Sequence, residues 1–263
     1  MKNIGIVYDR RKIEARDLAS SAAEWLRKQG HKVFLRLSED ILNKNMIDAV
    51  ITFGGDGTVL RAANMVVERQ IPILRVNFGK EGFLTNIEPH EIYDKLKIVF
   101  DDKNYIKQKR NRLQVIVRDQ NNDILLDQDA LNDIVIERSD TSVISCSLET
   151  GGNRFEFVGD AFIFAPRTGS TAYHESAGGR AITREDKIGF KVASPSNRDG
   201  EDRLIRAIDT VFMVSSVVYK ARLNIDGHKK IKRMDEMMKI EIKKSERFTI
   251  FMEIGDFGRM RGD

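Results

Sequence analysis

The sequence passes from a predicted strand into a predicted helix at Gly54-Gly55-Asp56-Gly57-Thr58. Residues 48–53, directly before it, are apolar and partly β-branched, which predicts a buried strand. Residues 59–67, directly after it, predict a helix. A strand that turns through glycines into a helix presents backbone N–H groups to an anion, above all to phosphate. Because a Cβ would obstruct both the tight turn and a phosphate, glycine suits this place, and the stretch predicts a phosphate-binding turn.

Asp56 is the unexpected member of this turn, because a carboxylate repels a phosphate. Its presence is explained if a metal ion lies between the two, or if it accepts a hydrogen bond from a hydroxyl that attacks a phosphoryl group. Both interpretations indicate phosphoryl transfer. A plain strand–turn–helix connection with Asp56 as a local cap is the alternative. The stretch matches neither the loop that ends in Gly-Lys-Ser/Thr nor Gly-x-Gly-x-x-Gly.

Composition is typical of a folded protein with a substantial core. The chain has 263 residues, 41% of them hydrophobic and 32% charged, which allows one large or two modest domains. The net charge of +4 suits anionic substrates but decides nothing alone. Cys146 is the single cysteine, so the chain forms no internal disulfide, and with four histidines a zinc site is not expected.

Several segments predict where the protein works and what it does not bind. No apolar run approaches the ~18 residues of a membrane span. The N-terminus is typical of a strand and not of a signal peptide, so we expect a cytoplasmic protein without a membrane partner. The basic runs at 107–112 and 229–233 are interpreted as solvated faces, and no nucleic-acid partner is expected.

The first hundred residues predict an α/β domain. Strands are expected at 2–8, 31–37, 48–53 and 72–78, and helices at 13–29, 39–44, 59–67 and 89–100. Gly30 is placed to end the first helix. This alternation predicts a parallel sheet covered by helices, whose ligands bind beyond the carboxyl ends of the strands, where Asp56 falls. The loop at 77–85, with two glycines, is a second candidate ligand-facing loop, or an ordinary turn.

A polar link at 101–104 marks a boundary, after which the pattern changes to short strands. Expected strands are at 113–117, 124–126, 134–138, 142–148, 154–158, 161–164, 211–218, 221–225, 238–242 and 248–252. Gly151-Gly152-Asn153 is typical of a hairpin turn. The second half is therefore predicted to be a mostly antiparallel β domain.

A second polar cluster lies within this β-rich half, at Gly159-Asp160 and at residues 167–179. Small hydroxyl residues and glycines leave room for a ligand there, and Tyr173 is able to stack on a base. A capped short helix, with Ser170 or Thr171 as the cap and Tyr173 in the core, is the alternative.

The motifs at 54–58, 77–84, 131–133 and 168–173, in this order and spacing, resemble those of the NAD kinase family. The resemblance covers roughly residues 2–227, and its most specific part is Thr-Gly-Ser-Thr-Ala-Tyr at 168–173. It implies transfer of a phosphoryl group from ATP, or in some members polyphosphate, to the adenosine-ribose 2′-hydroxyl of NAD. It also implies Mg²⁺ or another divalent cation carried by ATP, with no protein metal ligands, and a homodimer or homotetramer.

The resemblance further implies a two-domain fold with the active site in the cleft between the domains. The α/β domain would span residues 1–100 and the NAD-binding β domain residues 101–247, with about 248–263 returning to the first domain. Asp56 would act as base or positioner for the ribose hydroxyl. Phosphate binding is assigned to Gly54, Gly55, Gly57 and Thr58. NAD binding is assigned to Asn132, Asp133, Asp160, Thr171, Ala172, Tyr173, Ser176 and Asp226.

Some residues depart from the family pattern. Asp133 stands where the family usually has glutamate, which shortens its reach by one methylene. Gly159-Asp160-Ala161 replaces Gly-Asp-Gly, a small change. Arg167 adds a cation, and we hypothesise that it helps to hold a phosphate. Asp226-Gly227 is also what a two-residue hairpin turn requires.

Two other functions share parts of the pattern. A lipid kinase of the diacylglycerol or sphingosine type shares the glycine–aspartate turn. A dinucleotide-binding regulator without catalysis would fit the changes at Asp133 and Arg167. The phosphoryl donor, the choice between NAD and NADH, and feedback by NADP stay open.

Overall fold

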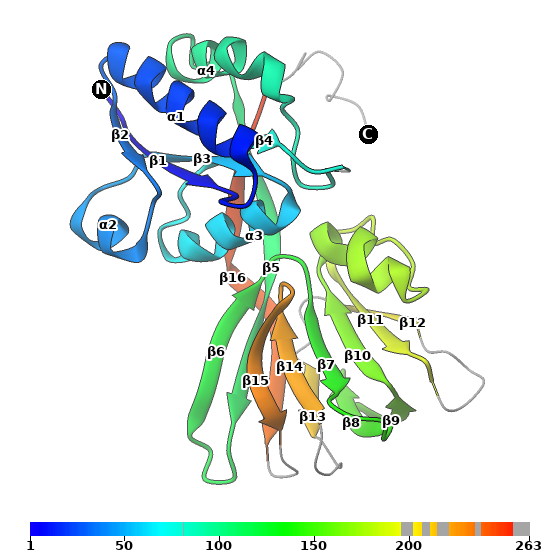
Figure 1. The fold of residues 1–263 in the computed structure, drawn as a ribbon. Helices are drawn as coiled ribbons and strands as arrows, with labels where there is room; N and C mark the ends of the chain where they lie inside the picture. The colour runs from blue at the N-terminus through cyan, green and yellow to red at the C-terminus, as the bar shows by residue number, and fades with distance from the viewer. Residues whose placement is uncertain (81, 196–201, 207–210, 215–220, 235–237, 255–263) are drawn as a thin grey trace. The chain divides into compact units, whose positions relative to one another are not determined.

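The structure is a computed structural model that describes residues 1–80, 82–195, 202–206, 211–214, 221–234 and 238–254. The chain forms two compact units (Figure 1). The first comprises residues 1–110 together with the segment from Thr249 onward, and the second comprises Asn111–Phe248. The first unit therefore continues about ten residues beyond the predicted domain end at residue 100.

The first unit is a parallel sheet with the strand order β2-β1-β3-β4-β16. Its strands are β1 (Asn3–Tyr8), β2 (Lys32–Leu35), β3 (Ala49–Gly54), β4 (Ile73–Asn77) and the end of β16 (Lys239–Glu253). Its helices are α1 (Ile13–Lys28), α2 (Glu39–Lys44), α3 (Asp56–Met65), α4 (Ile92–Phe100) and the short 3₁₀ turns η1 (Val67–Arg69) and η2 (Pro89–Glu91). Figure 1 shows α1 and α4 on one side of the strands and α3 on the other.

The core of this unit follows from the alternation of side chains along buried strands. Ile4 and Ile6 of β1 and Ile51 of β3 pack with the buried alanines of α1 and with Leu96 of α4. Gly30, with φ of +83°, ends α1 and donates its N–H to the carbonyl of Arg27, as expected. The predicted parallel α/β architecture is confirmed.

One helix starts earlier than predicted. Helix α3 begins at Asp56 and not at residue 59, and Gly55 is its N-cap. The backbone is already helical directly after Gly55, so the apolar spacing that begins at Val59 marks only the buried part of the helix. Asp56 is therefore a residue of the first helical turn.

The second unit consists of antiparallel sheets. One sheet has the order β12-β11-β10-β7-β14-β15, and another set of strands has the order β16-β13-β8-β9, with β5 pairing with β16 and β6. Their bounds are β5 (Ile106–Arg118), β6 (Ile124–Ala130), β7 (Ile134–Arg138), β8 (Ile144–Thr150), β9 (Asn153–Gly159), β10 (Ala161–Ala165), β11 (Lys187–Ala193), β12 (Asp202–Arg206), β13 (Val211–Val214), β14 (Ala221–Ile225) and β15 (His228–Met234). Apolar side chains from both sets form one core, which includes Phe164, Phe190 and Cys146. Burial raises the pKa of the Cys146 thiol, in keeping with its predicted role as a small core residue.

The strand predictions need several corrections. Strands β11, β12 and β15 were not predicted, and the two strands expected at 238–242 and 248–252 are one continuous strand, β16. Of the strand expected at 211–218, only Val211–Val214 falls within the described residues. Gly151 and Gly152 form the expected hairpin turn with φ of +55° and +78°.

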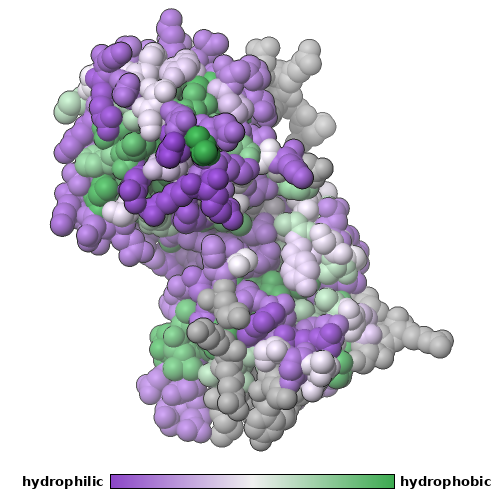
Figure 2. Space-filling view, viewed as in Figure 1, coloured by the Kyte–Doolittle hydropathy of each residue, from purple (hydrophilic) through white to green (hydrophobic). Residues whose placement is uncertain are grey.

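The basic run at 107–112 is not simply a solvated face. Lys107 and Lys109 are exposed on β5, but the side chain of Arg112, on the same strand, is fully buried. The run at 229–233 lies on β15, and part of its side chains are outside the described residues. Figure 2 shows hydrophilic side chains over much of the visible face, with hydrophobic ones in smaller patches. No helix in the described part of the chain is long and apolar enough for a membrane span.

Candidate functional site

The glycine turn lies at the carboxyl edge of the parallel sheet. Strand β3 ends at Gly54, whose carbonyl accepts the N–H of Phe78 at 3.1 Å. The carbonyl of Gly55 accepts the N–H of Thr58 at 2.9 Å, which closes the first turn of α3. The first N–H groups of α3 therefore open at the edge where α/β sheets bind their ligands.

The Asp56 carboxylate is held by the loop that follows β4. One oxygen accepts the N–H of Phe83 at 3.2 Å and the other accepts the N–H of Leu84 at 3.0 Å. These bonds go to the neighbouring loop and not to N–H groups of α3, so Asp56 does not act as a helix cap here. Each carboxylate oxygen has a second lone pair, so Asp56 is able to accept a further hydrogen bond from a ligand hydroxyl.

The three glycines of the turn differ in the space that surrounds them. A Cβ on Gly54 would lie 2.2 Å from Oγ1 of Thr58, so only glycine fits. A Cβ on Gly55 would make an ordinary contact, 3.5 Å from Cα of Gly79, and a Cβ on Gly57 would meet nothing within 4 Å. None of the three has a positive φ. Within the protein, steric fit therefore requires glycine at position 54 only, and Gly57 leaves open space beside Asp56.

The loop after β4 is built around Asn77. Its Oδ1 accepts the N–H of Gly79 at 2.8 Å, and a Cβ on Gly82 would come within 1.9 Å of Oγ1 of Thr85. The Lys12 ammonium donates to the carbonyl of Phe78. Together with the bonds to Asp56, these contacts fix the described part of the loop against the glycine turn.

The second unit has a cavity of about 440 Å³ that contains two of the predicted NAD-binding residues, Asp133 and Tyr173. Its lining is completed by Val135, Glu137, Arg222, Asn224 and Gly227. Residues 133, 135 and 137 follow the two-residue period of β7, and residues 222 and 224 follow that of β14. These neighbours were not predicted from the sequence, although extending the period of two from Asp133 indicates Val135 and Glu137.

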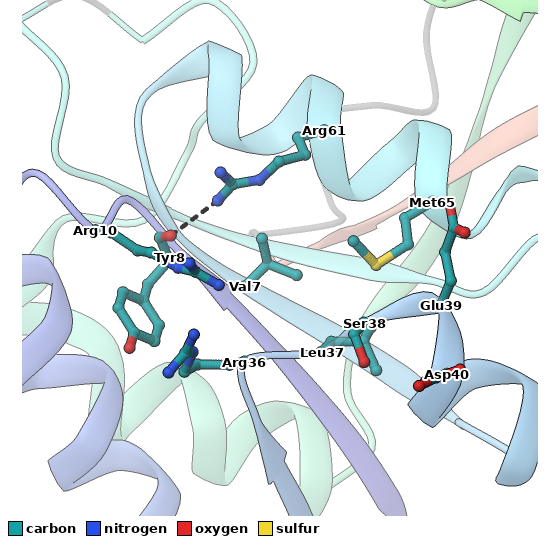
Figure 3. Close-up of a pocket in the computed structure, with 10 residues that line it drawn as sticks. All are labelled: Val7, Tyr8, Arg10, Arg36, Leu37, Ser38, Glu39, Asp40, Arg61 and Met65. Atoms are coloured by element: carbon teal, nitrogen blue, oxygen red, sulfur yellow. Dashed lines mark hydrogen bonds between the residues drawn. The ribbon is translucent and has the colours of Figure 1, made fainter.

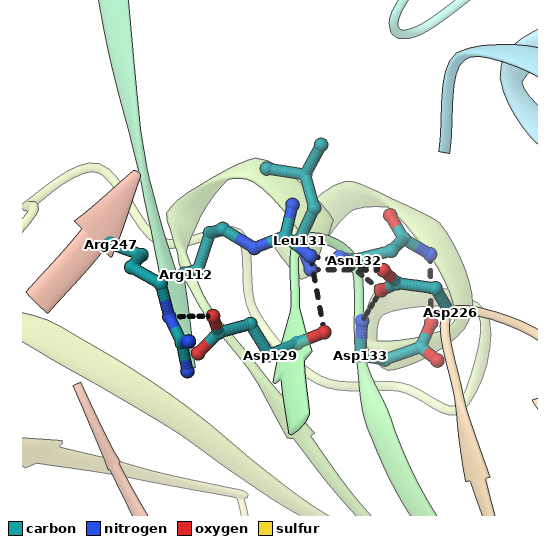
Figure 4. A network of polar contacts seen from close by, with 7 residues as sticks. All are labelled: Arg112, Asp129, Leu131, Asn132, Asp133, Asp226 and Arg247. Carbon is teal, nitrogen blue, oxygen red and sulfur yellow. Dashed lines mark hydrogen bonds and ion pairs between the residues drawn. The ribbon is translucent and has the colours of Figure 1, made fainter. Parts of the chain in front are cut away.

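A buried carboxylate, Asp226, organises the backbone beside this cavity (Figure 4). Its oxygens accept the N–H groups of Leu131 at 3.1 Å, Asn132 at 2.6 Å and Asp133 at 3.2 Å. The Arg112 guanidinium lies 3.9 Å from its Oδ2, and both side chains are fully buried. Asp226 and Gly227 also form the hairpin turn between β14 and β15, with φ of +50° and +74°. The hairpin-turn interpretation of Asp226-Gly227 is therefore confirmed, and NAD binding by Asp226 stays a prediction.

Burial raises the pKa of two cavity residues. The pKa of Asp133 is raised to about 6, chiefly because the carboxyl is buried and also because the Asp226 carboxylate is close. Asn132 opposes this by donating its Nδ2–H to Asp133 at 2.7 Å. The pKa of the Tyr173 phenol is raised by burial and by the nearby carboxylates of Glu137, Asp133 and Asp160. The cavity is thus acidic, with Arg222 as the cation in its lining.

The turn that carries Tyr173 packs directly on the Asn132 backbone. A Cβ on Gly169 would lie 1.6 Å from the carbonyl oxygen of Asn132, so glycine is obligatory there. The hydroxyl of Ser170 donates to the carbonyl of Arg167 at 2.8 Å and accepts the N–H of Ile182 at 2.9 Å. Tyr173 is 41% exposed, which excludes the alternative that places it in the core.

The other predicted residues lie apart from the cavity lining. Thr171, Ala172 and Ser176 belong to the same turn, and Ser176 Oγ donates to the carbonyl of Ala172 at 3.0 Å. Asp160 pairs with Arg138 at 3.2 Å. Arg167 pairs with Glu185 at 3.2 Å and does not line the cavity, so the structure gives no support to its predicted phosphate contact.

Among the described residues, no cluster of three or more His, Cys, Asp or Glu side chains is placed to hold a metal ion. Asp56 is the carboxylate within the glycine turn itself. One carboxylate together with ligand phosphates is a usual setting for Mg²⁺, so these residues fit a cation that arrives with a phosphate ligand.

A parallel α/β unit with a Gly-Gly-Asp turn and an antiparallel unit with a polar cavity define a two-domain nucleotide-binding protein. The family model described as the ATP-NAD kinase N-terminal domain matches residues 36–105. The NAD kinase of Syntrophobacter fumaroxidans is 36% identical over 194 residues, covering 69% of this chain and 68% of the relative. The NAD kinase of Methanothermobacter thermautotrophicus is 30% identical over 278 residues, covering 98% and 94%. The chain belongs to the NAD kinase family.

Solved structures show the same two-domain fold. Yeast NADH kinase complexed with NADH has a TM-score of 0.88 at 17% identity, with 99% of this chain and 86% of that chain covered. An NAD kinase from Archaeoglobus fulgidus in complex with ATP has a TM-score of 0.77 at 25% identity, with 95% and 93% covered. The predicted fold and family are confirmed.

Proposed function

We propose that this protein transfers the terminal phosphoryl group of ATP to the 2′-hydroxyl on the adenosine ribose of NAD, forming NADP. The observation that carries the proposal is the Asp56 carboxylate, fixed by two backbone N–H groups next to Gly57, where an added Cβ would meet nothing within 4 Å. Family membership supplies the substrates, because the relatives are NAD kinases. It also favours this activity over a lipid kinase.

The chemistry assigned to Asp56 is to orient the ribose hydroxyl and to accept its proton as the oxygen attacks the phosphorus. The free N–H groups of the first turn of α3 would bind the phosphate oxygens. Mg²⁺ carried by ATP would neutralise the phosphates when bound. Since a ribose hydroxyl is a weak nucleophile, most of the acceleration is expected from positioning and charge neutralisation.

The NAD-binding role is assigned to the second unit. Tyr173 presents a half-exposed ring for stacking on a base, and Asp133 presents acceptor oxygens for ribose hydroxyls. Asn132 and Asp226 keep the Asp133 carboxylate and its backbone in place. A cytoplasmic homodimer or homotetramer is the form that we propose for the working enzyme.

Replacing Asp56 by asparagine tests the assignment. The variant keeps one acceptor oxygen but loses the proton acceptor, so we expect kcat for NADP formation to fall about 10²–10⁴-fold. The measurement is NADP formation from NAD, ATP and MgCl₂, with chromatographic separation of the products. Thermal unfolding and NAD binding of the same sample show whether the fold and the acceptor site remain.

The matched control is Asp17→Asn on the outer face of α1, which removes the same charge from an exposed Asp17–Arg16 pair. Its kcat should equal that of the wild type. A wild-type rate in Asp56→Asn would refute the role of Asp56. Wild-type protein that binds NAD but forms no NADP with either ATP or polyphosphate would instead indicate a non-catalytic dinucleotide-binding regulator.

A further inference from the structure

The first unit also has a cavity, of about 500 Å³, at the carboxyl ends of β1 and β2 (Figure 3). The residues that line it are Val7, Tyr8, Arg10, Arg36, Leu37, Ser38, Glu39, Asp40, Arg61 and Met65. The predictions for the glycine turn and for the NAD-binding residues include none of them. Its size is typical of a pocket for a small ligand.

Arg10 belongs to the basic triplet Arg10-Arg11-Lys12, and the other two members are bonded within the protein. The triplet follows β1, and its second member, Arg11, donates to both oxygens of Asp9 at 3.0 Å. Its third member, Lys12, donates to the carbonyl of Phe78. Arg10 lines the cavity, and no hydrogen-bond or ion-pair partner for it exists among the described residues.

Arg36 reaches the cavity from a backbone conformation that favours glycine. Its φ is +67°, in the turn between β2 and α2. A non-glycine residue in this region is uncommon, and such strain concentrates at functional positions. Within the described part of the chain Arg36 also lacks a hydrogen-bond or ion-pair partner, so nothing there accounts for an arginine side chain at this position.

Arg61 links this cavity to the glycine turn. It lies on α3, five residues after Asp56, which is about 7.5 Å along the helix axis. Its guanidinium donates to the carbonyl of Tyr8 at 2.8 Å and is thereby held at the cavity wall. Donors of this guanidinium beyond the Tyr8 bond remain available for a ligand.

The cavity has two chemically different ends. Figure 3 shows the three arginines around Tyr8 at one end, with Met65, Glu39 and Asp40 at the other. Ser38, whose Oγ accepts the N–H of Ile41 at 3.4 Å, lies near the acidic end. The arginine end suits a multiply charged anion, and guanidinium groups bind phosphate through paired hydrogen bonds.

We propose that the arginine end of this cavity binds the phosphate chain of the phosphoryl donor, at the part that is not transferred. This rests on the proposed function, since it needs a donor whose terminal phosphate is at the glycine turn. ATP and inorganic polyphosphate share this chemistry. A chain of several phosphates spans the distance from the first turn of α3 to Arg61.

The test is a titration with magnesium tripolyphosphate and, separately, magnesium ATP, followed by calorimetry in 0.15 M salt. Arg10→Ala and Arg36→Gly should each raise the Kd of both ligands about tenfold, because each removes charge-assisted hydrogen bonds to phosphate. Arg36→Gly also relieves the left-handed backbone, so its Tm should not fall, and weaker binding will not reflect unfolding.

The matched control is Lys28→Ala, which removes one positive charge at the far end of α1. It should leave both Kd values within twofold of the wild type, and so should the Kd of NAD in all three variants. Tripolyphosphate binding that is unchanged in Arg10→Ala and Arg36→Gly, or weakened equally by Lys28→Ala, overturns the proposal. Weaker binding of ATP alone also overturns it, because recognition would then depend on the nucleoside.

Direct binding separates this proposal from the proposed function. If the wild type forms no NADP but the two arginine variants lose tripolyphosphate binding, the anion site stands and the NAD kinase activity fails. If the wild type forms NADP while the variants bind tripolyphosphate normally, the activity stands and this site fails.

Discussion

The glycine turn of the first unit and the Asp226 network of the second are built in opposite ways. The turn uses five consecutive residues, and its shape depends on backbone hydrogen bonds and on one close contact, between Gly54 and Thr58. The network joins Leu131, Asn132 and Asp133 to Asp226, which lies 93–95 residues away in the sequence. The first predicted site is thus stabilised by contacts between neighbours in the sequence. The second is stabilised by a buried charged residue that is distant in the sequence.

The two constructions carry different energetic risks. The glycine turn is stabilised by backbone hydrogen bonds. A substitution there should be tolerated where an added side chain has open space, and should destabilise the fold only where that side chain would collide. A buried carboxylate that accepts three N–H groups and faces a buried arginine leaves several polar groups unsatisfied when it is removed. We therefore expect the second unit to be the more sensitive to a single substitution.

The largest expected effect is that of Asp226→Ala. The variant removes the acceptor of the Leu131, Asn132 and Asp133 N–H groups and one of the carboxylates that face the buried Arg112. We expect the free energy of unfolding to fall by about 3–5 kcal/mol, measured by urea unfolding. Asp226→Asn keeps one oxygen and tolerates the left-handed turn, so it should lose less. The control is Asp160→Ala, which removes a half-exposed ion pair with Arg138 and should lower the free energy of unfolding by less than about 1 kcal/mol. Equal losses of stability in the two variants would contradict the greater sensitivity of the Asp226 network.

The next effect compares two glycines of the same turn. Gly54→Ala places a Cβ 2.2 Å from Oγ1 of Thr58, so overpacking should destabilise the fold by about 1–3 kcal/mol. Gly57→Ala meets nothing within 4 Å and adds helix propensity, so its Tm should stay equal or rise. If Gly57 is open for a phosphate, this variant should nevertheless have a raised KM for ATP. A destabilised Gly57→Ala would contradict the geometry of the turn.

The smallest expected effect concerns Asp133 and pH. Its pKa is raised to about 6 in the folded protein, from an ordinary value of 3.8, so the folded state binds the proton more tightly than the unfolded state. This stabilisation is present below about pH 4 and is lost as the pH rises to about 6. Asp133→Asn should therefore be more stable than the wild type at pH 7.5, by about 1–2 kcal/mol. A two-unit shift corresponds to about 3 kcal/mol, which is an upper bound for this effect.

The measurement is the difference in urea unfolding between Asp133→Asn and the wild type at pH 7.5 and pH 4.5. The difference should shrink at the lower pH. A difference that is independent of pH would show that Asp133 does not carry the charge that burial disfavours. NAD affinity of the variant, measured at pH 7.5, reports separately on its proposed role in binding.

The sequence was sufficient for the features that depend on neighbours along the chain. The alternation of strands and helices, the end of α1 at Gly30 and the hairpin at Gly151-Gly152 all follow from local spacing and turn chemistry. The family followed from four short motifs. The glycine turn was located for the same reason, although its helix begins at Asp56.

The features that were missed depend on partners distant in the sequence. Nothing near Arg112 in the chain indicates that a carboxylate from Asp226 will meet it in the core. Strand β15 is rich in lysine and β11 contains an internal glycine, so neither has the pattern of a strand until its neighbours in the sheet are known. Glu137 and Arg222 line the same cavity only because β7 and β14 are paired in the sheet. The Nε of Arg222 lies 2.7 Å from Oε1 of Glu137.

The position of β16 has a consequence for how the protein is made. Phe251 of β16 pairs with Ile73, and Glu253 lies 2.5 Å from the buried guanidinium of Arg75. On the ribosome, Arg75 is synthesised long before its counter-ion Glu253, and the sheet of the first unit lacks the strand beside β4 until β16 has been synthesised. The first unit is thus completed only after Asn111–Phe248 have been synthesised, and a chain released before residue 249 would leave the buried Arg75 without the Glu253 carboxylate.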